Sequence, residues 1–282
     1  MTARLQDLPF DPAALNRLSP ALITSHHQNN YGGAVKRLNA IRKDLAAMPF
    51  ATAPGFQLNG LKREELIATN SMLLHELYFA SLGGDGVTME PAAKLMLEAS
   101  FGSVERWREE FIAMGKALGG GSGWVLLVFQ PREGTLVNQW AADHTHALAA
   151  GVPILALDMY EHAYHMDFGA AAGAYVDALM VNIDWAAVYQ RYQQAVHAAS
   201  ESFAATQGDT ADALVLDVRE PSEWNDDLAL VDDRSAIALG GRVLPAETLV
   251  EGAREGRLFE HGNPGLPPQL LDALRHHARF CA

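Results

Sequence analysis

The chain of 282 residues contains a single cysteine, Cys281, which excludes an internal disulfide framework and suits a reducing compartment. Positive charge is also scarce, because 21 Lys and Arg face 34 Asp and Glu and the formal net charge is −13. This acidic balance argues against nucleic acid or an acidic membrane surface as a partner. No hydrophobic run approaches membrane-spanning length, and residues 1–10 lack the cationic and apolar regions of a secretory signal. We therefore expect a cytoplasmic protein.

Hydrophobic residues make up 49% of the chain, which is ample for a core, and the length suggests two domains. After an irregular arm over 1–18, apolar residues at helical spacing predict one helix from Ser19 to Leu45 and a second from Leu61 to Phe79. A proline-containing loop joins the two helices, which indicates an antiparallel helical hairpin.

The rest of the chain mixes helices and strands. We predict strands over 124–129, 134–141 and 152–157, and helices over 89–99, 103–117 and 183–198. This order predicts an α+β fold, with an N-terminal α-helical hairpin domain over 1–88 and an α/β domain with a small three-stranded antiparallel sheet over 89–199. The small polar residues of 200–212 are predicted to form a linker.

The most informative pair of polar residues is Asp158 and His162, four positions apart just after the strand predicted at 152–157. On a helical turn their side chains would point the same way and form half of a site for a first-row metal ion. The alternative is that Asp158 caps a helix in which His162 is a hydrogen-bonded core residue.

Two more histidines, His26 and His75, lie on apolar faces of the two long helices. A single histidine in such a setting is usually a hydrogen-bonded core residue. Together with the Asp158–His162 pair, however, they favour three histidines and one aspartate around a single ion. Imidazole and carboxylate ligands suit Fe, Mn or Zn, and spacing alone leaves the choice open.

Several motifs together resemble the iron/manganese superoxide dismutases over about residues 1–197. They are the first helix from Leu18 to Asn39, Phe101-Gly102-Ser103, Gly121-Ser122-Gly123-Trp124, and Asp158-x-x-Glu161-His162-Ala163-Tyr164. The resemblance implies that His26, His75, Asp158 and His162 hold one Fe or Mn ion per subunit. It also implies that this ion cycles between +3 and +2 and converts superoxide to O₂ and H₂O₂. It further implies a homodimer in which Glu161 reaches the equivalent of His162 in the partner subunit.

The sequence departs from that family at several positions near the expected metal. Where the family usually places a glutamine, His144 is the best match, and we assign it the role of orienting solvent, with His146 the next candidate. The tyrosine expected at position 34 is Ala34, and Tyr31 is the candidate to fill part of the space.

A second departure concerns the family's histidine and its tyrosine partner, which are replaced by Asn30 and His165, a change that looks matched across a dimer interface. The predicted catalytic residues are therefore His144, Tyr31 and Asn30, and the predicted interface residues are Glu161 and His165. Lys36 and Arg37 are candidates for a positive funnel toward the site, although both also fit a solvated helix face.

The C-terminal region has a resemblance of its own. Residues 214–224 and 240–245 resemble the opening and the central segment of a rhodanese-like domain. Such enzymes need a cysteine at the head of an anion-binding loop, and only Ala282 follows Cys281. We expect a degenerate or truncated small α/β rhodanese-like region over 213–282; the alternative is an acidic tail.

Three functional hypotheses follow. The first is an Fe- or Mn-dependent superoxide dismutase. The second is a non-haem iron oxygenase or hydrolase that uses two histidines and one carboxylate. The third is a metal-binding homologue with weak or lost activity.

Overall fold

A computed structural model describes residues 2–207, so the rhodanese-like region predicted over 213–282 lies outside the described residues. The described chain belongs to two compact units. The first contains residues up to Thr88, 110–128 and 138–188, and the second contains 89–109, 129–137 and the residues from Tyr189 onward. The predicted domain boundary at residue 88 is also the end of the first segment of the first unit, but the domain assignment as a whole stays a prediction.

The first unit begins with a long helical segment in three parts. A short 3-10 helix, η1 (Pro12–Ala14), precedes α1 (Pro20–Ser25), the π-helical η2 (His26–Tyr31) and α2 (Gly32–Ala47). As the sequence predicts, the Ser19 side chain caps α1 by accepting a hydrogen bond from the Leu22 N–H over 3.1 Å. The π-helical turn is a difference from the single α-helix predicted here.

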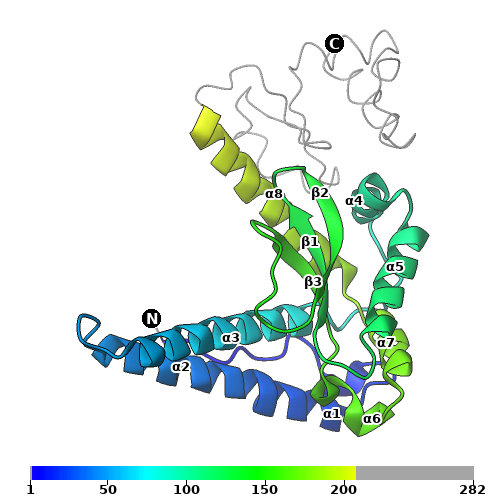
Figure 1. The fold of residues 1–282 in the computed structure, drawn as a ribbon. Helices are drawn as coiled ribbons and strands as arrows, with labels where there is room; N and C mark the ends of the chain where they lie inside the picture. Colours follow the sequence, from blue (N-terminus) through cyan, green and yellow to red (C-terminus); the bar gives the residue numbers. More distant parts are fainter. Residues whose placement is uncertain (1, 208–282) are drawn as a thin grey trace. The chain divides into compact units, whose positions relative to one another are not determined.

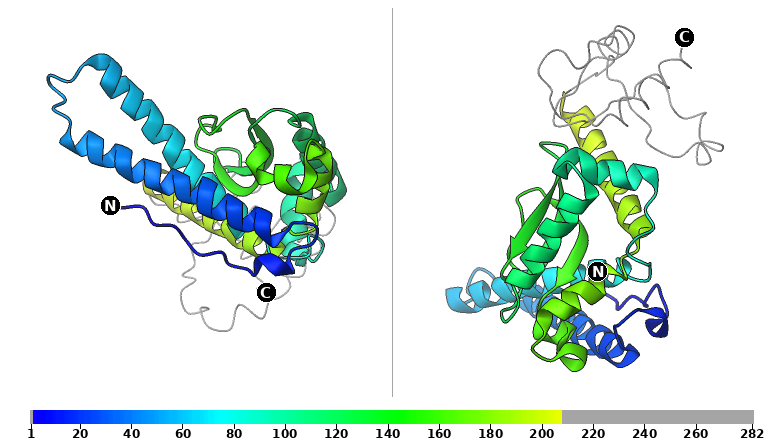
Figure 2. Two further views of the ribbon diagram at one scale, coloured as in Figure 1. Left: turned by 90° about the horizontal axis from the view of Figure 1, so that it is seen from below. Right: turned by 90° about the vertical axis from the view of Figure 1, so that its right-hand side faces the viewer.

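The second long helix, α3 (Gly55–Ala80), begins six residues before the predicted Leu61. The carbonyl of Pro54 accepts hydrogen bonds from the Gln57 and Leu58 N–H groups, so the first turn forms even though its glycine and polar residues carry little helical signal. Helices α2 and α3 lie side by side as the predicted hairpin (Figures 1 and 2). The buried residues between them are Leu38, Ile41, Leu45 and Ala68.

The predicted three-stranded antiparallel sheet follows, and its strand order in the structure is β2-β1-β3. The strands are β1 (Trp124–Gln130), β2 (Thr135–Ala141) and β3 (Val152–Asp158). Strand β1 is buried along most of its length and reads as a continuous apolar run. Within the first unit, β3 packs against α3 and so brings Asp158 toward the face of α3 that carries His75.

After β3 the chain forms η3 (Glu161–Ala163, a 3-10 turn), α6 (His165–Phe168), α7 (Ala172–Met180) and α8 (Trp185–Gln207). Helix α7 was not predicted, because its alanine and glycine residues give no distinct apolar stripe in the sequence. Residues 200–207, the first part of the predicted linker, are helical and continue α8. Residues 208–212 lie outside the described residues.

The second unit contains α4 (Pro91–Phe101) and the first part of α5 (Val104–Ala117), close to the predicted helices. Gly102 separates α4 from α5 with a left-handed φ of 86°, a common way to end a helix. The Leu136 N–H donates a hydrogen bond to the Ser100 hydroxyl over 2.9 Å, and the Phe129 and Tyr192 rings meet edge to face.

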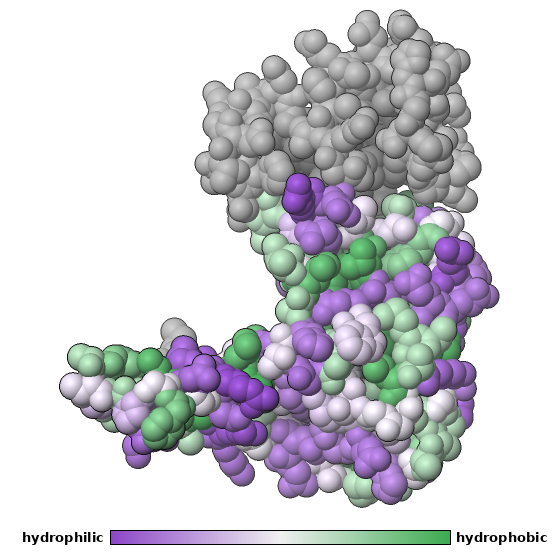
Figure 3. Space-filling model, in the orientation of Figure 1, coloured by the Kyte–Doolittle hydropathy of each residue, from purple (hydrophilic) through white to green (hydrophobic). Residues whose placement is uncertain are grey.

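The surface of the hairpin is mixed in character. Hydrophilic residues group across it on the face shown in Figure 3, whereas its far end is more apolar, with Phe50 and Phe56 exposed there. Over the part of the chain that the structure describes, none of the helices combines the length and the apolarity needed to cross a membrane.

Candidate metal centre

Four side chains from three distant stretches meet in the first unit: His26, His75, Asp158 and His162. Their ligand atoms all lie within 4.8 Å of one another. The Nε2 atoms of His26 and His162 each lie 3.1 Å from Asp158 Oδ2, and the Nε2 atom of His75 lies 3.5 Å from the same oxygen. The structure therefore brings together the four residues that the sequence singled out as a metal site.

His26 reaches this cluster from the first residue of the π-helix η2. A π-helical turn is wider than an α-helical turn and is frequent at functional sites. Its imidazole is fully buried and contacts the rings of His75 and Phe79 at centroid distances of 5.0 Å each. Burial lowers the pKa of His26, so the neutral ring that a metal ion requires is the favoured form.

His75 shows most directly that the cluster suits a cation. Its Nδ1–H donates a hydrogen bond to the Ser71 backbone carbonyl over 2.6 Å, and burial lowers the pKa of the ring to about 3. The ring is therefore neutral with its proton on Nδ1, and Nε2 presents a lone pair toward Asp158 Oδ2. His162 Nε2 lies 3.4 Å from His75 Nε2. A positive ion between the His75 lone pair and the Asp158 carboxylate would relieve their repulsion.

Asp158 and His162 meet without the helical turn that the sequence predicts, and that prediction is wrong. Asp158 is the last residue of β3, and His162 lies in the 3-10 turn η3. The chain bends between them because Asp158 Oδ1 accepts a hydrogen bond from the Tyr160 N–H over 2.9 Å, a local turn typical of aspartate. Burial would raise the pKa of the Asp158 carboxyl, but hydrogen bonds from His162 and His26 outweigh it and hold the pKa below its ordinary value.

His144 lies in the loop after β2, next to the cluster. Its Nδ1 accepts a hydrogen bond from the Trp124 indole N–H over 3.0 Å. The Tyr160 ring stacks on His144 at a centroid distance of 4.8 Å and on His162 at 5.4 Å. Sequence reasoning gave Trp124 no role of this kind, although its place at the start of a buried strand beside a glycine-rich turn was visible.

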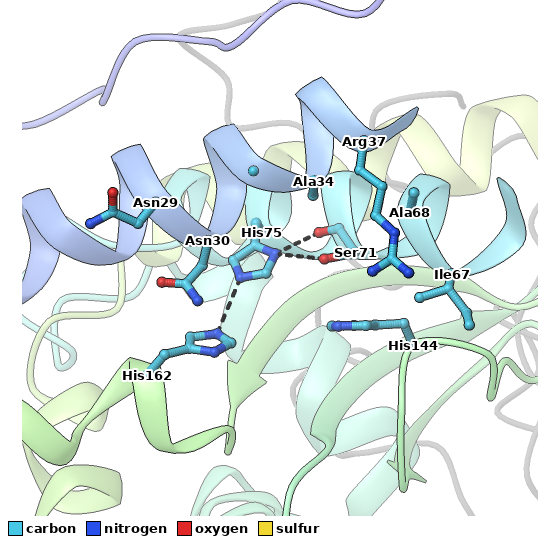
Figure 4. Close-up of a pocket in the computed structure, with 11 residues that line it drawn as sticks. Asn29, Asn30, Ala34, Arg37, Ile67, Ala68, Ser71, His75, His144 and His162 are labelled. Atoms are coloured by element: carbon cyan, nitrogen blue, oxygen red, sulfur yellow. Dashed lines mark hydrogen bonds between the residues drawn. The ribbon is translucent and has the colours of Figure 1, made fainter. Parts of the chain in front are cut away.

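A pocket of about 260 Å³ opens onto the metal cluster in the first unit. Figure 4 shows that α2 and α3 supply most of its walls, with His144 and His162 on the opposite side. The lining residues are Asn29, Asn30, Gly33, Ala34, Arg37, Ile67, Ala68, Ser71, His75, His144 and His162. Asn30 and His144 thus line the pocket, and their catalytic role stays a prediction. His146 instead accepts a hydrogen bond from the Ala142 N–H.

Tyr31 is directed elsewhere. Its hydroxyl donates to Glu76 over 2.8 Å and accepts from the Gln6 N–H over 3.0 Å, and it is not among the residues that line the pocket. Its ring stacks on His75 at a centroid distance of 6.4 Å. The catalytic role of Tyr31 stays a prediction.

Comparison with known proteins agrees with this geometry. The family profile described as iron/manganese superoxide dismutases, C-terminal domain, matches residues 89–191. The chain belongs to the iron/manganese superoxide dismutase family, as the motifs of the sequence indicated.

The matches to individual relatives cover nearly the whole length of each relative. The chain is 64% identical to an iron superoxide dismutase of Cupriavidus metallidurans over 196 residues, which cover 70% of this chain and 99% of the relative. It is 35% identical to a manganese superoxide dismutase of Halobacterium salinarum over 198 residues, covering 68% and 95% of the two chains. An iron superoxide dismutase of Aquifex pyrophilus is 33% identical over 195 residues, covering 66% and 90%. These matches favour a superoxide dismutase over an oxygenase or hydrolase.

Proposed function

We propose that this chain is a superoxide dismutase that converts superoxide to O₂ and H₂O₂ with one Fe or Mn ion held by His26, His75, Asp158 and His162. The observation that carries the proposal is the convergence of these four ligand atoms within 4.8 Å. The bound ion supplies the redox chemistry by cycling between +3 and +2, which Zn cannot do. The buried carboxylate of Asp158 favours the more highly charged ion.

His144 supports the proposal through its hydrogen bond with Trp124. An indole N–H is only a donor, so Nδ1 of His144 must be an unprotonated acceptor. The neutral ring therefore carries its proton on Nε2 and can donate it in a hydrogen bond to solvent in the pocket. Stacking on Tyr160 holds the ring in this orientation. We assign His144 the role that a glutamine usually fills in the family, with Asn30 as a second polar group in the same pocket.

We also propose a homodimer. Glu161 and His165 are exposed on either side of His162, which itself keeps 26% of its side chain exposed. We infer that a second copy covers this partly exposed metal ligand, and we expect Glu161 to reach the equivalent metal ligand of the partner. Sedimentation of the native chain and of Glu161→Ala tests this, since a monomeric native protein would contradict it. The cytoplasm is the location that we propose, in keeping with the single cysteine.

The decisive experiment is to prepare the metal-free chain, reconstitute it separately with Fe and Mn, and measure bound metal together with superoxide consumption. The 64% identical relative is an iron enzyme, which supports iron as the first metal to test. Asp158→Asn should lose both metal and activity. Asp177→Asn is the control: it removes the same charge from a surface ion pair with Lys116, and it should keep both metal and activity. A native chain that binds either metal without consuming superoxide would overturn the proposal.

A further inference from the structure

The pocket over the metal cluster carries one unusual charge. Among the described residues that line it, Arg37 alone bears a permanent positive charge. Its neighbour Lys36 is exposed and is not among the lining residues, so the two candidates for a positive funnel are no longer equivalent. In a chain of net charge −13, this guanidinium lines the same pocket as the metal ligands His75 and His162.

One side of helix α2 lines the pocket with small residues and ends at Arg37. Gly33, Ala34 and Arg37 lie on one side of α2, because Arg37 follows Gly33 by four residues and Ala34 by three. Asn30, in the preceding π-helix η2, lines the same pocket. A side chain added at Gly33 would meet no atom within 4 Å, and Ala34 contributes only a methyl group. The space between the guanidinium and the metal ligands is therefore open to a small anion. Figure 4 shows Arg37 extending from α2 toward the side of the pocket that holds Ile67 and His144.

The partner of Arg37 is a carboxylate on the other helix of the hairpin. Glu64 on α3 forms an ion pair with Arg37 and a second, at 3.3 Å, with Arg63. The side chain of Arg37 is 57% exposed and that of Glu64 is 30% exposed, so the pair lies at the solvent edge of the pocket. Such exposed pairs are weak and readily exchanged, which allows an incoming anion to compete with Glu64 for the guanidinium.

We propose that Arg37 forms an outer binding site for small anions at the edge of the metal pocket, where Glu64 is a built-in competitor that the anion displaces. This rests on the proposed function in taking superoxide as the physiological anion. The guanidinium offers hydrogen-bond donors and charge to any small anion, and a site of this kind raises the local concentration of substrate ahead of the metal. It acts on substrate approach and leaves the metal ligands untouched.

The test uses azide as a probe anion with the metal-loaded full-length chain. Its dissociation constant is measured from the visible absorption of the metal at low and at physiological ionic strength. Arg37→Gln should weaken azide binding and lower kcat/KM by at least about threefold at low ionic strength, with a smaller effect at 0.15 M salt because charges are screened over about 8 Å there. Arg37→Lys should restore part of the loss.

Arg63→Gln is the matched control. It makes the same change in net charge and removes the other partner of Glu64, but Arg63 is not among the pocket-lining residues. It should leave the azide affinity and kcat/KM within about 1.5-fold, as expected of a solvated surface charge. Glu64→Gln should tighten azide binding, because it removes the competing carboxylate.

Equal effects of Arg37→Gln and Arg63→Gln on azide affinity and on its salt dependence would overturn the inference, because only the global charge would then matter. A native chain without superoxide consumption would instead overturn the proposed function. In that case the azide measurement would still decide whether Arg37 binds anions.

Discussion

The indole N–H of Trp124 donates a hydrogen bond to Nδ1 of His144 over 3.0 Å, which leaves Nε2 to carry the proton of the neutral imidazole. Burial lowers the pKa of His144, so this neutral form is favoured. A buried tryptophan at the first residue of β1 thus decides which ring nitrogen can donate a hydrogen bond to the pocket. The side chain that we propose to orient solvent is thus held in one tautomer by a residue that does not itself line the pocket.

The first prediction follows from this hydrogen bond. His144→Gln keeps a side-chain donor and should retain activity within about tenfold, whereas His144→Ala should lose about 100-fold or more, in the range usual for a group that assists proton transfer. Rates by pulse radiolysis on samples of matched metal content measure the difference. Equal losses in the two variants would show that the donor has no role.

A pair of glycines gives the second prediction. Gly123 has a φ of +137°, and an added side chain would collide with the carbonyl oxygen of Ala141. Gly123→Ala should therefore destabilise the fold by about 2 kcal/mol or more. Gly60, inside α3, has open space and ordinary helical geometry, so Gly60→Ala should stabilise by about 0.5–1 kcal/mol. Urea unfolding of both variants against the native chain tests these opposite signs.

The third prediction concerns Asn182, a fully buried amide. Its oxygen accepts from the Asn16 N–H over 2.7 Å, and its nitrogen donates to the carbonyls of Asn16 and Ala178, also over 2.7 Å. Asn182→Ala leaves these backbone groups unpaired and should cost about 2 kcal/mol in the free energy of unfolding.

Asn29→Ala is the control for this effect. Asn29 is exposed and its amide donates only to the Ser25 hydroxyl, so the change should stay within about 0.5 kcal/mol. A similar loss in the two variants would mean that burial of the Asn182 amide contributes nothing specific.

The identity of the metal ligands could be predicted from the sequence, whereas the local backbone that holds them could not. His26, His75, Asp158 and His162 stood out because imidazole and carboxylate groups on apolar elements are costly unless something pairs them. The bend that joins Asp158 to His162 was not predictable from spacing, since a helical turn and an aspartate turn both bring side chains four apart together. Likewise, the π-helix at His26 depends on packing that no local pattern encodes.

The orientation of Tyr31 was partly predictable. Its position near Ala34 suggested that it fills part of the space there, although it was expected to project from a different side of the helix, and in the structure it is the last residue of the π-helical turn. The phenol reaches Gln6 and Glu76, contacts made by a segment that precedes the helix and by the neighbouring helix α3.

Metal removal gives the fourth prediction. A ligand that binds only the folded chain stabilises it by about 2.7 kcal/mol at 100 times its dissociation constant. The metal-free chain keeps the Asp158 carboxylate and the His75 lone pair facing each other in a buried cluster, so it should unfold at a lower temperature than the Fe-loaded chain. Calorimetry with and without chelator measures this shift. Identical midpoints for the metal-free and the Fe-loaded chain would contradict a structural contribution of the ion.

Tyr31→Phe gives the fifth prediction and separates two roles for the phenol. The hydroxyl has two hydrogen-bond partners, and burial raises the pKa of Tyr31 to about 12, so it stays protonated over the working range of pH. Loss of the hydroxyl should cost about 1–2 kcal/mol of stability, because Glu76 and the Gln6 N–H lose a partner. Since the hydroxyl faces these groups, we expect kcat to change less than threefold, well below the effect of His144→Ala. A loss of kcat as large as that of His144→Ala, at equal metal content, would instead make Tyr31 part of the proton supply through its contact with His75.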